Sequence, residues 1–396
     1  MNTELLAQVA STPRSNNETA KVQSLEELEI SMKRHKEDWI CPSSDALFDF
    51  NSSMGTHGRF TIRLRDRLTL PTNRNFNSTM YSRLATGLKS YASHLVDTDQ
   101  IPLLLQNAND QLDIKGKKYM IRAQENANGI MIARAFLGDT YKRIDDELVF
   151  DVIKKELANS DLDFEIVGGR RTMDRTYFNI ISKEPVLTLG DRSIHIGFTV
   201  STSDTGGASM QFTLFACDGY CLNGMRFNQI DAYGFKAVHR GPRLDKEFGL
   251  LPSSNIIDKD DVKVEDVIEK IKAGVRKVTN PAKHQEIISL ITKADQAEVT
   301  GESIAIIEKI AEDNKFSDIE TAMAREAFRE GEDTLLGIQS SITRMAQESH
   351  SFTRRVELEQ IGGRLLTCHL YTSDAADYLI RVNRCGRPAS QTNNTV

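Results

Sequence analysis

Residues 162–219 read LDFEIVGGRRTMDRTYFNIISKEPVLTLGDRSIHIGFTVSTSDTGGASMQFTLFACDG. Short apolar runs are separated here by Gly, Asp and Lys at close spacing, which is typical of antiparallel strands joined by turns. We predict strands at 162–168, 176–182, 185–190, 193–203 and 208–219. Because these strands cluster and do not alternate with helices, the pattern favours an α+β fold with an antiparallel β-meander over a doubly wound fold.

Upstream of this stretch, the pattern predicts further strands and flanking helices. The run RFTIRLRDRLTL from Arg59 alternates apolar and basic residues, as a half-buried strand with a basic outer face does. KKYMIRAQ (117–124) and GIMIARAFL (129–137), joined by ENAN, predict a β-hairpin. Helices are predicted at 24–40, 78–95 and 141–160, the first from a Ser24/Glu27 capping-box spacing, and residues 41–58 are predicted as loop.

Beyond Pro252 the apolar spacing becomes helical and charges are frequent, which predicts a helical C-terminal domain with breaks at Asn280-Pro281 and Thr300-Gly301. The peptide LYTSDAAD at 370–377 matches the translation of a common sequencing adapter, so we expect residues after about 368 not to be native. We therefore divide the chain into a disordered arm (1–23), an N-terminal helix and loop (24–58), an α+β core (59–250), a helical domain (255–350) and a tail (351–396).

Composition limits the class of protein. The 396 residues are 39% hydrophobic, which is ample for a buried core, and no apolar run approaches the ~18 residues of a membrane-spanning helix. The N-terminal residues lack a basic segment followed by an apolar one, so no signal peptide is indicated, and the five scattered cysteines do not indicate a disulfide scaffold. We expect a cytoplasmic protein that does not contact membranes. The net charge of −6 hides a basic middle, residues 59–246, between acidic segments.

Motifs for catalysis and cofactors are weak. No phosphate-binding loop is present, and SDTGGAS (203–209) is more typical of a β-turn in which Gly206 and Gly207 take positive φ. Cys217 and Cys221 are too isolated to indicate zinc, and we interpret them as buried thiols. Asp145 and Asp146 would diverge by about 100° on a helix, so they are interpreted as first-turn residues. We expect no cofactor, no metal and no catalytic residue.

Basic residues give the clearest functional signal. Arginine and lysine favour phosphate contacts, and neighbouring aromatic side chains such as Tyr177 and Phe178 can stack on unpaired bases. Residues 168–175 would form a hairpin tip that carries three arginines. The alternative is that the charges only protect sheet edges from aggregation. The candidate nucleic-acid-binding residues are Arg63, Arg65, Arg67, Arg74, Lys117, Lys118, Arg170, Arg171 and Arg175.

Three segments, ARAFLGDTYKRIDDELVFDVI (133–153), STSDTGGASM (201–210) and CDGYCLNGM (217–225), together resemble the phage/plasmid-like family that carries domain of unknown function 932. The resemblance covers about 115–250 and departs from the family pattern at Ser201-Thr202-Ser203-Asp204, where the family turn begins with asparagine. It implies a phage or plasmid context and no particular reaction. The resemblance falls on Asp139, Tyr141, Asp145, Gly206, Ser209, Cys221, Asn223 and Gly224.

These observations lead to one main hypothesis and two alternatives. The main hypothesis is a phage- or plasmid-encoded protein that binds nucleic acid, with single-stranded DNA as the expected ligand, in replication or recombination. Its acidic helical domain would form a homo-oligomer or contact a replication or recombination protein. One alternative is a metal-dependent enzyme on nucleic acid or nucleotides, with a site around Asp139, Tyr141, Asp145 and Asn223. The other is a counter-defence protein that acts by protein–protein contact alone.

Overall fold

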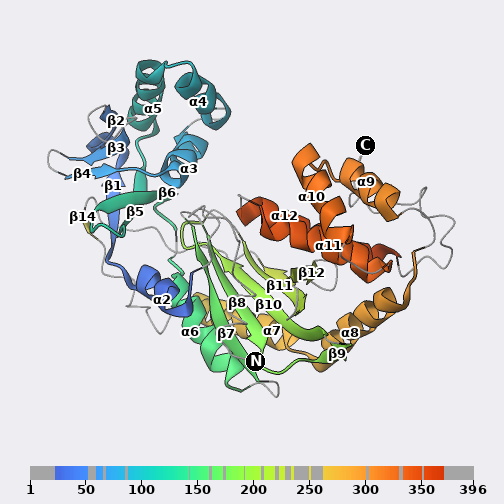
Figure 1. Cartoon of the computed structure of the whole chain (residues 1–396). Coiled ribbons are helices and arrows are strands. Elements are labelled where there is room, and N and C mark those ends of the chain that lie inside the picture. Colours follow the sequence, from blue (N-terminus) through green and yellow to red (C-terminus); the bar gives the residue numbers. More distant parts are fainter. Residues whose placement is uncertain are drawn as a thin grey trace, which may run out of the picture.

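The computed structural model of the chain has an α+β architecture, with antiparallel sheets and helices in the N-terminal part and a helical C-terminal region (Figure 1). No helix among the described residues is long and apolar enough to cross a membrane. The described residues are 23–51, 59–65, 68–84, 88–141, 143–159, 163–172, 175–190, 192–206, 209–218, 223–227, 233–235, 249–250, 262–299, 303–329, 333–349 and 352–369.

An N-terminal lobe contains two of the three sheets and one apolar core. Its strands and helices are β1 (Lys36–Pro42), β2 (Ala46–Asn51), β3 (Arg59–Leu64), β4 (Leu68–Pro71), β5 (Lys118–Glu125), β6 (Met131–Gly138), β14 (Gly249–Leu250), α3 (Arg74–Leu84), α4 (Leu88–Asp97) and α5 (Ile101–Lys115). The strand orders are β2-β3-β4 and β14-β1-β5-β6. The predicted alternation of β3 is confirmed at residues 62–64, because Ile62 and Leu64 are buried in the core while Arg63 is exposed, but Thr61, expected on the solvent side, is buried.

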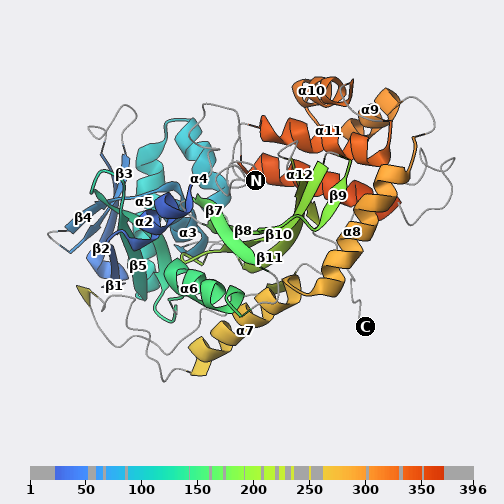
Figure 2. The ribbon, with the colours of Figure 1, turned by 60° about the horizontal axis from the view of Figure 1, so that its bottom comes forward.

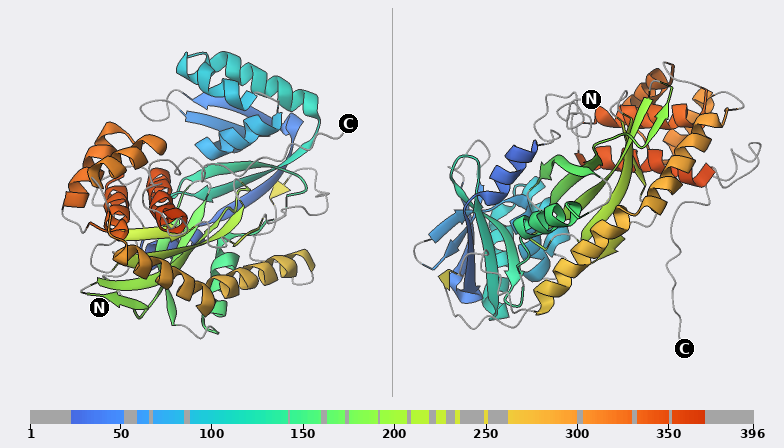
Figure 3. Two further views of the ribbon diagram at one scale, coloured as in Figure 1. Left: turned by 90° about the vertical axis from the view of Figure 1, so that its right-hand side faces the viewer. Right: turned by 90° about the horizontal axis from the view of Figure 1, so that it is seen from below.

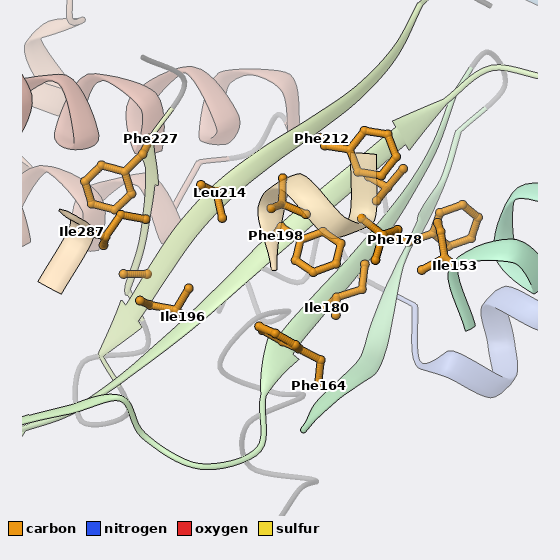
Figure 4. Packing of buried hydrophobic residues seen from close by; sticks show 14 of the residues in the cluster. Ile153, Phe164, Phe178, Ile180, Ile196, Phe198, Phe212, Leu214, Phe227 and Ile287 are labelled. Carbon is orange, nitrogen blue, oxygen red and sulfur yellow. The ribbon is translucent and has the colours of Figure 1, made fainter. Parts of the chain in front are cut away.

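The central sheet has seven antiparallel strands, and it confirms the predicted meander. They are β7 (Phe164–Arg171), β8 (Thr176–Ser182), β9 (Leu187–Leu189), β10 (Arg192–Thr202), β11 (Met210–Asp218), β12 (Asn223–Phe227) and β13 (Tyr233–Phe235). One face packs Phe178, Phe198 and Ile196 against α6 (Asp146–Leu157), α7 (Val262–Val278) and α8 (Pro281–Gln296) (Figure 4). Figure 2 shows α7 and α8 running along this face, where apolar burial drives the packing.

The helical region covers the β12 end of the opposite face. It comprises α9 (Ser303–Asp313), α10 (Asp318–Arg329), α11 (Leu335–Gln347) and α12 (Phe352–His369), and it lies at the other end of the molecule from the N-terminal lobe (Figure 3). A Cβ at Gly363 of α12 would come 2.0 Å from the Arg226 carbonyl oxygen of β12, so only glycine permits this approach. Arg226 also pairs with Glu359 of α12 at 2.5 Å. Residues that the sequence analysis assigned to the tail thus form a packed helix.

Several predicted elements need correction. The capping box at Ser24 and Glu27 is confirmed, but the helix it begins is short, α2 (Leu25–Lys33), and β1 follows, because residues 36–42 pair with β5. The predicted loop 41–58 contains a 3₁₀ turn, η1 (Ser43–Asp45), and β2. The predicted helix 78–95 is two helices, α3 and α4. Residues 1–22, 300–302 and 370–396 lie outside the described residues.

Candidate nucleic-acid interface

The predicted basic positions that the structure describes with their side chains separate into two places in the fold. Arg63, Arg65, Lys117 and Lys118 lie in the N-terminal lobe, whereas Arg170, Arg171 and Arg175 belong to the β7–β8 hairpin. β7 continues through Arg171, so the prediction that residues 168–175 form the hairpin tip is wrong. Arg67 lies outside the described residues, as does the side chain of Arg74.

The four N-terminal positions meet at the η1 turn, and we call them the η1 basic cluster. At one end of the turn, the Ser43 backbone N–H donates to the Lys117 carbonyl oxygen at 2.8 Å. At the other end, the Arg65 backbone N–H donates to the Asp45 carbonyl oxygen at 2.7 Å. Two segments far apart in sequence are therefore joined through a turn of three residues.

Most of the charge in this cluster is uncompensated. Arg65 Nε pairs with Asp45 Oδ2 at 2.9 Å, but both side chains are partly exposed and such a pair is worth little. Arg63 and Lys117 are exposed, Lys118 is half-buried, and none of the three has an ion pair within the described part of the chain. The cluster thus presents a local positive surface on a protein that is acidic overall.

Arg171 has the opposite environment, because its guanidinium is buried among carboxylates. Its Nε lies 3.1 Å from Asp146 Oδ2, and its Nη2 lies 3.1 Å from Asp204 Oδ2. The side chain is only 7% exposed. The Arg171 side chain is therefore not at the surface, where the sequence analysis placed it.

Arg171 belongs to a larger buried network, the ionic junction. Arg122 pairs with Asp38 at 2.9 Å and with Asp145 at 2.6 Å, and Arg134 holds both oxygens of Asp204. The junction joins β1, β5 and β6 of the N-terminal lobe to α6, β7 and the turn after β10. Its arginines and aspartates are equal in number: Arg122, Arg134, Arg143 and Arg171 against Asp38, Asp145, Asp146 and Asp204.

The surroundings shift the pKa values of Asp204 and Asp146 in opposite directions. Burial by itself raises the pKa of Asp204, but Arg134, Arg171 and Arg122 outweigh it and hold that pKa well below its usual range. The pKa of Asp146 is raised, because burial and the neighbouring Asp204 outweigh Arg171 and the Thr176 hydroxyl. Asp204 therefore carries the charge that the arginines neutralise, and Asp146 is the better site for a proton.

Two residues that carry the family resemblance, Tyr141 and Asp145, make contacts in this junction. The Tyr141 hydroxyl donates to the Asp204 carbonyl oxygen at 3.2 Å, and Asp145 binds Arg122. Gly206 has φ +71°, and a Cβ there would come 2.9 Å from the Tyr141 ring, so the predicted glycine turn is confirmed at this position and glycine is needed for two reasons.

The other resemblance positions lie elsewhere. Ser209 is half-buried, and Asn223 and Gly224 begin β12 opposite Asp218 and Cys217. Asp139 helps to raise the pKa of Tyr119, after burial as the main cause. Cys217 is a buried free thiol, as predicted, and Cys221 lies outside the described residues.

The sequence analysis missed Asp38, Arg122, Arg134, Arg143 and Asp204, which form most of the junction. One signal was available: Arg122 stands in KYMIRAQ, a strand that is buried on both faces, where a charge requires a partner.

Two observations concern the hypothesis of a metal-dependent enzyme with a site around Asp139, Tyr141, Asp145 and Asn223. Burial raises the pKa of Tyr141 above its ordinary value. Within the described ranges, no group of three or more His, Cys, Asp or Glu residues is placed to hold a metal ion. The enzyme and the protein-contact hypotheses both stay predictions.

Comparison with models of protein families, with curated proteins and with solved structures finds no match to this chain. The resemblance to the phage/plasmid-like family therefore stays a prediction that rests on the quoted motifs alone.

Proposed function

We propose that this protein binds nucleic acid, with single-stranded DNA as its ligand, through the η1 basic cluster. The observation that carries the proposal is the η1 turn itself, which brings the Arg63–Arg65 segment and the Lys117–Lys118 segment together. Exposed cations grouped in this way release condensed counterions when they bind phosphates, and that release drives binding to a polyanion.

The position of these residues within the sheets argues against the alternative of edge protection. Charged residues that prevent aggregation stand on edge strands. Arg63 lies on β3, the middle strand of β2-β3-β4, and Lys118 lies on β5, which has β1 on one side and β6 on the other. Neither strand has a free edge to protect, so the charges call for another explanation, and a phosphate backbone supplies one.

The biological role follows from the same proposal. The resemblance to a family of mobile elements supports a role in phage or plasmid DNA replication or recombination, where single strands are exposed. The acidic helical region would then contribute a self-association surface or contact a replication or recombination protein, because its charge disfavours DNA.

The test measures binding of a dye-labelled oligo(dT) by fluorescence anisotropy at increasing salt. We expect log affinity to fall linearly with log salt, with a slope of about −0.7 for each phosphate contacted. The double variant Lys117→Gln/Lys118→Gln should bind about tenfold more weakly at low salt and show a shallower slope.

The matched control is Lys154→Gln/Lys155→Gln, which removes the same charge from two adjacent exposed lysines of α6. It should bind within about twofold of the wild-type protein if position matters and not only net charge. Equal losses in the two double variants, or no binding by the wild-type protein at low salt, would reject the proposal.

A further inference from the structure

The face of the central sheet opposite α6 and α7 carries a row of polar side chains near the β7–β8 turn. Residues that are directly opposed on antiparallel strands share a face. Arg170 of β7 is opposed to Tyr177 of β8, Tyr177 to Ser201 of β10, and Ser201 to Gln211 of β11. These four side chains form one row across the sheet, which we call the ledge.

The ledge lies at the accessible end of this face. Two rows further along the same face, Arg226 is buried beneath Gly363 and Glu359 of α12. In the ledge, by contrast, Gln211 is exposed, and Arg170 and Tyr177 are half-buried. Figure 1 shows α11 and α12 beside β12, with β7 at the opposite edge of the sheet.

The ledge combines a cation with an aromatic ring. Burial lowers the pKa of the Arg170 guanidinium more than the facing Tyr177 raises it. An anion bound beside Arg170 would offset this loss of solvation. Arg175, also half-buried, lies two residues before Tyr177 at the end of the hairpin and adds a second positive charge to the same end of the sheet.

We propose that the ledge holds one nucleotide of a bound single strand, with its base stacked on Tyr177 and its phosphate contacted by Arg170. The inference rests on the proposed function and extends it by naming a contact with a base, which the η1 basic cluster does not supply. Ser201 is buried within the row, and the exposed Gln211 continues it as a hydrogen-bonding group for the edge of that base.

A single strand fits this row better than a duplex or an acidic peptide. In a duplex the faces of the bases are stacked on one another and cannot reach an aromatic ring. An acidic peptide would use Arg170 but would leave the ring of Tyr177 without a flat partner. Stacking on an aromatic ring and contact with an arginine fork together are typical of unpaired nucleotides.

The experiment compares two probes, oligo(dT) and an abasic oligonucleotide with the same number of phosphates. The wild-type protein should prefer oligo(dT). Tyr177→Ala should lose this preference, about 5- to 100-fold in affinity for oligo(dT), with little change for the abasic probe. Tyr177→Phe should keep the preference, because the ring remains.

Further variants complete the test. Arg170→Gln should weaken binding of both probes by a similar factor, because both carry the phosphate. The control variant Tyr91→Ala removes another tyrosine, 51% exposed on α4, and should bind both probes like the wild-type protein. Thermal unfolding of each variant checks that it is folded.

The outcomes separate this inference from the proposed function. If the wild-type protein binds neither probe, the proposed function fails and this inference fails with it. If the wild-type protein binds and Lys117→Gln/Lys118→Gln weakens binding, but folded Tyr177→Ala keeps the full preference for oligo(dT), only the ledge is rejected. Loss of the preference in Tyr177→Phe would also reject stacking.

Discussion

Arginine has opposite surroundings in the ionic junction and in the η1 basic cluster. In the junction, Arg122 is 3% exposed and each guanidinium meets a carboxylate from another part of the chain. In the cluster, Arg63 is exposed and has no ion pair within the described part of the chain, and Arg65 pairs with a partly exposed Asp45. The same residue type thus joins two lobes in one place and presents charge to solvent in the other. Distant carboxylates decide which role an arginine takes.

The largest effect should come from removing the central anion of the junction. Asp204→Asn leaves the guanidinium groups of Arg134 and Arg171 buried without their shared carboxylate, and an uncompensated buried charge is costly. We expect a loss of about 3–5 kcal/mol in the free energy of unfolding at neutral pH, measured by urea denaturation. Asp151→Asn, an exposed position on α6, is the control and should change it little.

The pH dependence of that loss has a definite sign. The pKa of Asp204 is held low in the folded protein, so its contribution to stability is present above the pKa of the unfolded chain and is lost as pH falls through the folded pKa. The difference between wild type and Asp204→Asn should therefore shrink in acid. A difference of under 1 kcal/mol at neutral pH would contradict the role given to the junction.

A smaller loss is expected from the turn that places Asp204. Gly206→Ala forces a side chain into positive φ and against the Tyr141 ring, which together should cost about 1–3 kcal/mol in unfolding free energy. Gly129 offers a matched control, because its φ is +72° and a Cβ there meets nothing within 4 Å. Gly129→Ala should therefore show the conformational cost alone, and equal losses at both positions would show that the contact with Tyr141 is unimportant.

The difference between the junction and the η1 basic cluster also explains which features could be predicted from the sequence. Strands such as β3 and β8 were recognised because alternation or an apolar run is visible within a few residues. The junction could not be predicted, because Asp38 and Asp204 come from strands and turns far apart in sequence and only their pairing with Arg122 and Arg134 gives them a role. Arg171 was misjudged for the same reason: as a sequence position beside Arg170 it resembles a surface charge, and alternate residues of β7 face opposite sides of the sheet.

Asp146 should be far less sensitive than Asp204, although both contact Arg171. Its Oδ2 accepts hydrogen bonds from Thr176 at 2.5 Å and Arg171 at 3.1 Å, while its Oδ1 has no hydrogen-bond partner in the described part of the chain. An asparagine keeps the accepting oxygen and cannot ionise, and burial and Asp204 penalise the ionised form of Asp146, so Asp146→Asn should change the free energy of unfolding by less than about 1 kcal/mol.

The raised pKa of Asp146 also predicts the direction in which its contribution to stability changes with pH. Ionising it disfavours the folded state, so this penalty begins as pH rises through the unfolded pKa and is complete above the folded one. Asp146→Asn should remove that component of the pH profile, measured by urea denaturation at several pH values. A loss as large as that of Asp204→Asn would contradict the smaller contribution to stability that we expect from Asp146.

The smallest effect on stability belongs to the η1 basic cluster. Arg65→Gln removes an exposed ion pair with Asp45, and Arg63→Gln removes a charge that has no ion pair within the described part of the chain. Each should change the free energy of unfolding by no more than about 0.5 kcal/mol, whereas the affinity for oligo(dT) should fall. Stability and binding then respond to different parts of the molecule: Asp204→Asn in the junction destabilises the fold, whereas cluster variants leave the protein folded but weaken its contact with phosphate. A cluster variant that destabilised the fold as much as Gly206→Ala would show that these charges are structural, and the positive surface of the N-terminal lobe would need another explanation.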